Sequence, residues 1–230
     1  MTPPTALLTG ASRGLGAALA EALSRRGWRL VVDGRDPDRL AAAVAALPRP
    51  DLVTALAGDV TDPAHRAALA AAVGDRLELL VNNASDLGPT PLPRLADLPA
   101  AALERVLAVN AVAPLALVQA VLPALERAGG TVLDGSSDAA VEAYEGWGGY
   151  GASKAALDQL SAVLAVEHPG LRVYAVDPGD MATDMHRAAD PGATGLPTPE
   201  SVVPALLRLV DGDRSSGRYR AADLAAEAIR

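Results

Sequence analysis

Short runs of leucine and β-branched residues alternate along the chain with longer segments in which alanine and leucine recur at the helical period. The short runs are apolar throughout, without regular polar positions, which is typical of strands buried on both faces. We therefore predict strands at 5–10, 29–33, 52–57, 77–82, 130–135, 171–176 and 217–221. The longer segments predict helices at 14–26, 37–47, 63–73, 99–112, 114–128, 149–167 and 199–210.

Strands that alternate with helices indicate an α/β fold: a single-domain, Rossmann-type, doubly wound parallel sheet of about seven strands with helices on both faces. In such a fold the ligand crevice lies at the carboxyl ends of the strands. No linker or repeat divides residues 1–230, and a substrate lid is expected at about 180–198. Pro114 suits a helix start, so 99–128 is expected to form two helices or one helix with a kink.

Composition limits the classes of function. Half of the 230 residues are apolar, which is enough for a sizeable core, and the net charge of −8 argues against a nucleic-acid or anionic-membrane surface. Cysteine is absent and the three histidines are scattered, so no metal site is predicted. No apolar run reaches membrane-spanning length and no signal-peptide pattern opens the chain, so a soluble cytoplasmic protein is the expectation.

The first predicted strand leads through a glycine-rich turn into a helix, with the sequence Thr9-Gly10-Ala11-Ser12-Arg13-Gly14-Leu15-Gly16. Glycines let the backbone turn sharply and approach a phosphate, and a helix N-terminus offers free N–H groups and a positive dipole end. The spacing, Gly-x3-Gly-x-Gly, differs from the usual dinucleotide fingerprint. At the first strand–helix turn of a doubly wound sheet, the segment predicts a dinucleotide site; a purely structural turn is the alternative.

Two arginines bear on the choice of dinucleotide. Arg13 lies within the glycine-rich turn, and Arg35 follows the second predicted strand, where the adenosine ribose is expected. An acidic residue there would bind a ribose 2′-hydroxyl, whereas arginine can pair with a 2′-phosphate. Asp33 lies on the same side as Arg35 by strand alternation, while Gly34 takes the discriminating position and leaves room for the phosphate. NADPH is therefore favoured over NADH; two solvated surface arginines are the alternative.

Tyr150 and Lys154 lie four residues apart at the start of a predicted helix, which places both side chains on one face. Lys154 is the only lysine among 20 basic residues, in a chain with four tyrosines, so this spacing is an improbable accident. A nearby ammonium favours the phenolate and is expected to lower the tyrosine pKa, which suits proton transfer. A surface pair without a chemical role is the alternative.

Ser137 ends the fifth predicted strand, thirteen residues before Tyr150 and at the same edge of the sheet. A hydroxyl at that edge can hydrogen-bond a substrate carbonyl and stabilise a developing alkoxide. Asp138 follows it and places a carboxylate near the substrate. That carboxylate could repel anionic substrates or bind a cationic one, or it could be a solvated loop residue. Leu87, Tyr144 and Trp147 are expected to form walls of the substrate cleft.

Together the glycine-rich turn, Ser137, Tyr150 and Lys154 resemble the short-chain dehydrogenase/reductase family, over essentially the whole chain and in the family's order. Further matches are Asp59-Val60, which the family places at the adenine ring, and Asn82-Asn83-Ala84 of its Asn-Asn-Ala-Gly motif. Two more are Asn110, where the family has a helix asparagine that holds a relay water, and Pro178-Gly179 with Thr183 at the nicotinamide carboxamide. Ser85 replaces the last glycine of Asn-Asn-Ala-Gly, so the following loop is expected to differ.

The resemblance implies a role for each catalytic residue. Tyr150 is the general acid in carbonyl reduction, Lys154 lowers its pKa and binds the nicotinamide ribose, Ser137 orients the carbonyl, and Asn110 supports the proton relay. The implied cofactor is NADPH or NADP+, with NADH less favoured. It would be bound by Gly10, Ser12, Arg13, Gly14, Leu15, Gly16, Arg35, Asp59, Val60, Asn82, Ala84, Tyr150, Lys154, Pro178, Gly179 and Thr183.

Two functions are compatible with this sequence. The leading hypothesis is an NADPH-dependent reductase of a small ketone or aldehyde, which would run in reverse on secondary alcohols. The alternative is a non-catalytic NADP(H)-binding sensor or scaffold of the same fold. By the resemblance, the chain is expected to form a homodimer or homotetramer through the helices at about 99–128 and 149–167. The segments 114–125 and 155–166 are apolar nearly all round, which fits burial between subunits.

Overall fold

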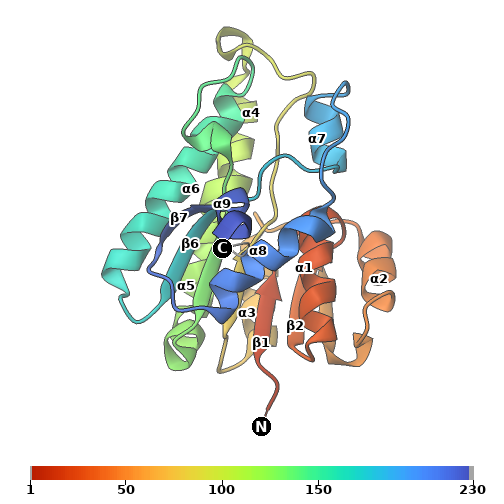
Figure 1. Cartoon of the computed structure of the whole chain (residues 1–230), viewed down its shortest axis with the longest axis vertical. Helices are drawn as coiled ribbons and strands as arrows, with labels where there is room; N and C mark the ends of the chain where they lie inside the picture. The colour runs from red at the N-terminus through yellow and green to blue at the C-terminus, as the bar shows by residue number, and fades with distance from the viewer. Residues whose placement is uncertain (1, 228–230) are drawn as a thin grey trace.

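A computed structural model describes residues 2–227, and within them the chain forms one sheet of seven parallel strands (Figure 1). The strands are β1 (Thr5–Leu8), β2 (Arg29–Gly34), β3 (Val53–Ala57), β4 (Leu79–Asn82), β5 (Thr131–Gly135), β6 (Arg172–Asp177) and β7 (Gly217–Arg220). Their spatial order is β3-β2-β1-β4-β5-β6-β7, so the direction of winding changes between β1 and β4. The α/β doubly wound parallel sheet predicted from the sequence is confirmed.

Helices cover both faces of the sheet (Figure 1). One face is covered by α1 (Gly14–Arg25), α8 (Pro199–Asp211) and α9 (Ala221–Ala226), and the other by α3 (Pro63–Val73), α5 (Ala113–Ala128) and α6 (Gly148–Glu167). The remaining helices are α2 (Pro37–Ala45), which packs against β2 and β3, α4 (Ala100–Leu107), which packs against α6, and α7 (Asp184–Ala189).

Successive strand residues alternate between two separate cores. Ala6 and Leu8 of β1 pack with α1 and α8, whereas Leu7, between them, packs with α3 and α5. All three side chains have no exposed surface. Each fully buried leucine contributes about 1.5–3 kcal/mol by leaving water, so the sheet is held from both sides. This two-sided burial is the reason the strands read as continuous apolar runs in the sequence.

The predicted strands and helices are all present, and their ends differ by at most two residues, except that α4 ends at Leu107 where the helix was expected to reach residue 112. The strand β1 ends at Leu8, not at residue 10, because Gly10 has a φ of +66° and begins the turn toward α1. Two helices, α7 and α9, were not predicted. Each has six residues, which is too few for a recognisable helical period.

The segment Ala100–Ala128, predicted as two helices or one helix with a kink, forms two α-helices, α4 and α5, that join without a loop into one helical run of 29 residues. A π-helical turn, Ala108–Val112, joins α4 to α5 directly before Pro114, which cannot donate the usual helical hydrogen bond. By length and composition alone the run could cross a membrane, with a mean hydropathy of 1.9 in its most apolar window. Half of that window is buried, and the run packs against α3, α6 and β4 as a core helix does.

Candidate active site

The glycine-rich turn between β1 and α1 requires its glycines for two reasons. Gly10 and Gly14 have φ values of +66° and +57°, which residues with a side chain rarely adopt. A Cβ on Gly16 would lie 2.4 Å from the Gly10 carbonyl oxygen, so this glycine allows α1 to pack closely on the turn. Arg13 occupies the N-cap position of α1 without a side-chain capping bond. The first N–H groups of α1 are therefore available to an anion.

Thr9 and Asn83 fasten the turn to the neighbouring strand. The Thr9 hydroxyl accepts hydrogen bonds from the backbone N–H groups of Asn83 and Ala84, each at 3.0 Å. The Asn83 side-chain amide donates to the carbonyl oxygens of Thr9 and Gly10 at 2.9 and 3.1 Å. Together these bonds fix the ends of β1 and β4, between which the winding of the sheet changes direction.

Four arginines line the cavity above the turn, and they differ in what they bind. Arg187 pairs with Asp184. Arg13 donates to the Asp184 carboxylate at 2.7 Å, and Arg105 donates to Asp59 at 2.9 Å. Arg35 is exposed, and no carboxylate in residues 2–227 pairs with it. Arg35 is thus the one of the four whose guanidinium has no carboxylate partner among the described residues.

Asp59 follows β3 and was predicted to contact an adenine ring. Although partial burial acts to raise its pKa, hydrogen bonds from Thr61 and Arg105 lower the pKa of Asp59 to about 2. The carboxylate is therefore charged and already bound by protein donors. It fixes the loop after β3 and the position of Arg105.

The structure changes the interpretation of Gly34. A Cβ at this position would lie 3.0 Å from the Ser12 Cβ, so the space beside Gly34 is already filled by Ser12. Gly34 therefore allows the glycine-rich turn to approach β2, rather than leaving an empty space for a phosphate as expected. The Asp33 side chain is buried next to it and hydrogen-bonded by the protein.

Tyr150 and Lys154 lie together on the first turns of α6, as predicted. The Lys154 Nζ lies 5.5 Å from the centroid of the Tyr150 ring. It donates a hydrogen bond of 2.6 Å to the Gly135 carbonyl oxygen at the end of β5, and the lysine side chain is buried. The ring of Trp147 meets that of Tyr150 edge-on at 5.7 Å between centroids. The pair is thus held in place, with its ammonium bound to the sheet.

The Tyr150 phenol is a weaker acid than expected. Burial raises the pKa of Tyr150 to about 12, and the carboxylates of Asp177 and Asp138 act in the same direction. Hydrogen bonds with the hydroxyls of Ser85 and Ser137 oppose this rise but do not cancel it. The tyrosine pKa is therefore raised rather than lowered, because burial is the largest effect.

Lys154 is also perturbed. Burial lowers the pKa of Lys154 to about 8, while the carboxylates of Asp134 and Asp158 act to raise it. At neutral pH the pair therefore consists of a neutral phenol and a protonated amine. These are the states that a proton donor and its supporting cation require.

Asn110 lies in the π-helical turn and has no exposed surface. Its amide oxygen accepts from the Asp86 N–H at 2.7 Å and the Ser85 hydroxyl at 3.3 Å, and its amide nitrogen donates to Ser153 at 2.9 Å. The Ser153 hydroxyl in turn donates to the Tyr150 carbonyl oxygen at 2.6 Å. Asn110 thus connects the loop after β4 to the helix of the tyrosine and lysine, and π-helical turns are frequent at functional sites.

Ser137 lies at the end of β5 beside the acidic residue that follows it. Its hydroxyl donates to the Asp138 carboxylate at 3.0 Å, and Tyr144 donates to the other oxygen of Asp138, also at 3.0 Å. Asp138 is therefore bound by neighbouring side chains and is not simply a solvated loop residue. Its carboxylate accepts the Ser137 hydrogen, which must turn away from Asp138 to bond the carbonyl that the sequence predicts.

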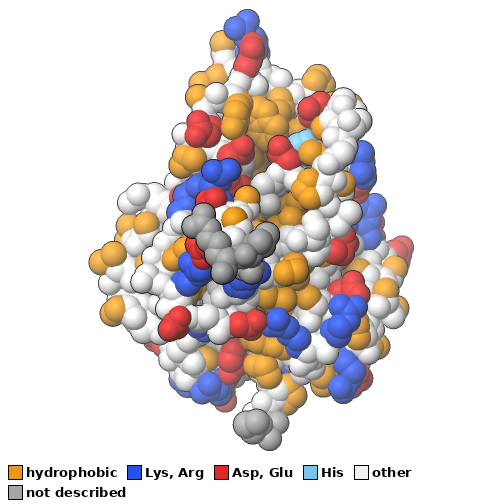
Figure 2. Space-filling view, in the orientation of Figure 1, with side chains coloured by type: hydrophobic (Ala, Val, Ile, Leu, Met, Phe, Trp, Pro, Cys, Tyr) orange, Lys and Arg blue, Asp and Glu red, His pale blue; other side chains and the backbone are white. Residues whose placement is uncertain are grey.

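Two cavities meet at Tyr150. One, of about 580 Å³, is lined by the glycine-rich turn, the ends of β2 and β3, and residues 198–200. The other, of about 570 Å³, is lined by Ser137, Asp138, Tyr144, Trp147 and part of the segment 177–196. Figure 2 shows a hollow above α9 whose floor is hydrophobic and whose rim carries acidic side chains. The residues that line both cavities are Ser136, Tyr150, Pro178, Met181, Thr183 and Met185.

Most predicted cofactor residues line the first cavity: Gly10, Ser12, Arg13, Gly14, Leu15, Arg35, Asp59, Val60, Ala84, Tyr150, Lys154, Pro178 and Thr183. Three do not. Gly16 packs against Gly10, Asn82 donates to the buried Asp134 carboxylate at 2.8 Å, and Gly179 lines the second cavity. The sequence reasoning missed Ser85 and Arg105, which line the first cavity. The sequence marks Ser85 only as a departure from the Asn-Asn-Ala-Gly motif. Arg105 belongs to no motif, and only the folded chain brings its helix to the cavity.

Comparison with known proteins agrees with this architecture. Residues 4–193 match the family model of short chain dehydrogenases. Sepiapterin reductase of Mus musculus is 37% identical over 199 residues, which cover 80% of this chain and 76% of that protein. A short chain dehydrogenase of Shigella flexneri, solved in complex with NADP, has a TM-score of 0.89 and 27% identity, over 96% of this chain and 98% of the other.

An alcohol dehydrogenase of Thermococcus sibiricus, solved with 5-hydroxy-NADP, has a TM-score of 0.85 and 27% identity and covers 95% of this chain and 96% of its own. The family match spans the glycine-rich turn, the tyrosine–lysine pair and the residues that line both cavities, apart from those at 196–200. The chain belongs to the short chain dehydrogenase family and is an NAD(P)-dependent oxidoreductase acting on CH–OH groups.

Proposed function

We propose that the protein is an NADPH-dependent reductase of a ketone or aldehyde, reversible on the corresponding alcohol. The observation that carries this proposal is the position of Tyr150, which lines both the cavity above the glycine-rich turn and the cavity that contains Ser137. A carbonyl in the second cavity and a cofactor in the first would meet at this phenol. NADPH, when bound, supplies the hydride.

The other steps of the reaction are assigned to residues of the chain. Tyr150 donates its proton to the forming alkoxide, since its phenol is neutral with a pKa of about 12. Lys154 holds a positive charge beside the phenol, on a side chain fixed by the Gly135 carbonyl. The Ser137 hydroxyl, whose hydrogen Asp138 accepts in the structure, turns to donate it to the substrate oxygen. The glycine-rich turn and the N-terminus of α1 bind the cofactor phosphates.

The test is consumption of NADPH, followed by its absorbance, with a panel of ketones and aldehydes. Tyr150→Phe removes only the hydroxyl and is expected to abolish turnover while NADPH binding persists. Tyr219→Phe is the matched control, because its hydroxyl bonds the Ser215 carbonyl away from both cavities. A Tyr150→Phe enzyme with unchanged turnover would refute the mechanism. Binding of NADPH without turnover of any carbonyl would instead favour the sensor or scaffold function.

The preference for NADPH over NADH is also part of the proposal. Arg35 lines the cofactor cavity and has no carboxylate partner within the described chain, so its guanidinium can pair with a 2′-phosphate. We expect Arg35→Ala to weaken NADPH binding much more than NADH binding. Arg39→Ala is the control, since Arg39 is exposed on the adjacent helix α2. Equal losses for the two cofactors would contradict this assignment.

The segment 180–198 is proposed to act as a lid. It contains α7, and it contributes walls to both cavities through Met181, Thr183 and Met185. Its Asp184 binds Arg13 at 2.7 Å across the glycine-rich turn. Both side chains of this ion pair are about half exposed to solvent, so the pair contributes little stability and can open readily.

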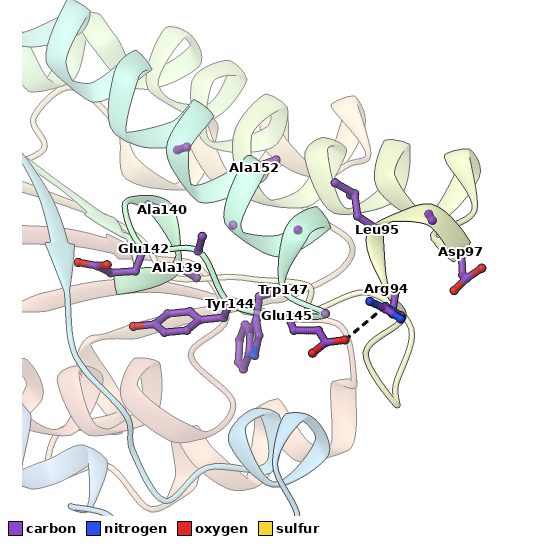
Figure 3. Close-up of a pocket in the computed structure, with 16 residues that line it drawn as sticks. Arg94, Leu95, Asp97, Ala139, Ala140, Glu142, Tyr144, Glu145, Trp147 and Ala152 are labelled. Carbon is purple, nitrogen blue, oxygen red and sulfur yellow. Dashed lines mark ion pairs between the residues drawn. The ribbon is translucent and has the colours of Figure 1, made fainter.

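We further propose that the protein forms a homodimer or homotetramer through α4, α5 and α6. The large hydrophobic side chains that are exposed in the described chain all lie between residues 95 and 166: Leu95, Val112, Leu115, Val141, Tyr144, Val163 and Val166. A cavity of about 730 Å³ opens in the same region, between the segment 94–97 and the start of α6 (Figure 3). Arg94 and Glu145 pair at its rim at 3.3 Å. A second copy of the chain would cover this apolar surface.

A further inference from the structure

A buried acidic residue at the cofactor cavity is not explained by the proposed chemistry. Asp33 lies near the end of β2, two residues before Arg35, and is 1% exposed. One of its carboxylate oxygens accepts a hydrogen bond of 2.6 Å from the Gly10 N–H of the glycine-rich turn. The other lies 3.2 Å from Nε2 of His65. Because a carboxylate accepts hydrogen bonds, Nε2 is the ring nitrogen that carries the hydrogen.

His65 reaches this carboxylate from the first turn of α3, and its surroundings fix its position. Asp62 caps the helix by accepting from the Ala64 N–H at 2.8 Å, and Pro63 follows at the first helical position. The imidazole packs against the backbone at Gly58, where a Cβ would lie 2.3 Å from the ring nitrogen Nδ1. The side chain is 8% exposed. The histidine therefore has little freedom to leave Asp33.

The direction of the Asp33 carboxylate matters for the neighbouring ligand site. Asp33, Gly34 and Arg35 all line the cofactor cavity, and Arg35 is the residue proposed to bind a 2′-phosphate. A carboxylate turned toward that site would repel the phosphate and could accept a hydrogen bond from a ribose 2′-hydroxyl. In the structure both of its oxygens are instead occupied by Gly10 and His65.

We propose that His65 is a positioning residue for cofactor discrimination: it holds the Asp33 carboxylate toward the Gly10 N–H and away from the adenosine ribose, and so preserves the preference for NADPH. The inference rests on the proposed preference for NADPH. This role of His65 also explains why an aspartate two residues before Arg35 does not make the protein prefer NADH. The carboxyl group is present, but its hydrogen-bonding positions are satisfied inside the protein.

The test compares two amides at position 65. Gln places its side-chain nitrogen where Nε2 of the histidine lies, whereas the shorter Asn reproduces only the inner nitrogen. His65→Asn is expected to lower the ratio of NADPH affinity to NADH affinity by roughly tenfold, as for loss of one hydrogen bond to a charged group, while His65→Gln retains most of it. Affinities are measured by titration calorimetry on the full chain. His168→Asn is the control, because His168, which pairs with Glu126, lies at the amino end of β6, away from the cofactor cavity.

A second variant protects the test against a general loss of structure. Adding Asp33→Ala to His65→Asn is expected to restore the preference, since the carboxylate that misdirects binding is gone. The inference is overturned if His65→Asn weakens both cofactors equally, if it leaves the ratio unchanged, or if the Asp33 substitution does not restore the ratio. A wild-type protein that binds NADH more tightly than NADPH would instead refute the proposed cofactor preference.

Discussion

The burial of Lys154 predicts an unusual dependence of stability on pH. Its pKa is lowered to about 8 in the folded chain from 10.5, chiefly by burial. A lowered amine pKa means that, between these two values, the unfolded chain binds more protons than the folded chain, so stability rises with pH in that window. At about 1.4 kcal/mol per pKa unit, the full difference corresponds to about 3 kcal/mol. Between neutral pH and about pH 9.5, the free energy of unfolding should therefore rise by roughly 2 kcal/mol.

Lys154→Met tests this prediction, because methionine is unbranched and cannot carry the charge. Lys154 is the only lysine in the chain, so no second lysine contributes to the comparison. Unfolding free energies are measured in urea near neutral pH and near pH 9.5. The wild-type protein should gain stability over that interval, and the variant should not. Parallel changes in the two proteins would refute the reasoning, because the gain would then come from other groups. Above pH 10 the raised pKa of Tyr150 acts in the opposite direction, so the interval ends before that value.

Other predictions concern the substrate and the assembly. Ser137→Ala should lower kcat by about a hundredfold with little change in NADPH affinity, as measured by steady-state kinetics and calorimetry, because an alkoxide donor is lost. Among the described residues, the second cavity is lined by Asp138, Asp177, Asp180 and Asp190 and by no lysine or arginine, so keto acids should be reduced less efficiently than neutral ketones of the same shape. Asp138→Asn should narrow that gap severalfold in kcat/KM. Val166→Asp, at a side chain that is 81% exposed, should weaken self-association in light scattering without lowering the melting temperature.

The fold could be predicted because its strands are buried on both faces and its helices are long enough to show their period. Leu7 and Leu8 pack on opposite faces, so the sequence shows an unbroken apolar run that indicates a parallel sheet. The π-helical turn at Ala108–Val112 could not be predicted, because its residues have ordinary helical preferences. Only the bonding pattern around Pro114 distinguishes it from a regular helix.

Site residues could be predicted where they lie together in one short segment of the sequence. The turn from Thr9 to Gly16 and the pair Tyr150 and Lys154 are local, and the structure brings them to one cavity. Contacts between distant segments were not predictable. The bond from His65 to Asp33 joins residues 32 positions apart, and the ion pair of Arg13 with Asp184 joins residues 171 apart. The residues next to His65 and Arg13 in the sequence do not indicate that Asp33 and Asp184 are their partners.

The acidity of Tyr150 also explains why reduction is the direction we propose. In the structure the phenol has a pKa of about 12, so near neutral pH it holds the proton that a forming alkoxide needs. Alcohol oxidation needs the phenolate instead, and the carboxylates of Asp177 and Asp138 both oppose it. Lys154 offers limited help, since its own pKa of about 8 means that it loses its charge before the phenol titrates. A phenolate at Tyr150 therefore requires a second positive charge, which the oxidised nicotinamide carries and the reduced one does not. Burial and the two carboxylates therefore keep the Tyr150 phenol protonated, which is the state that proton donation to a carbonyl requires.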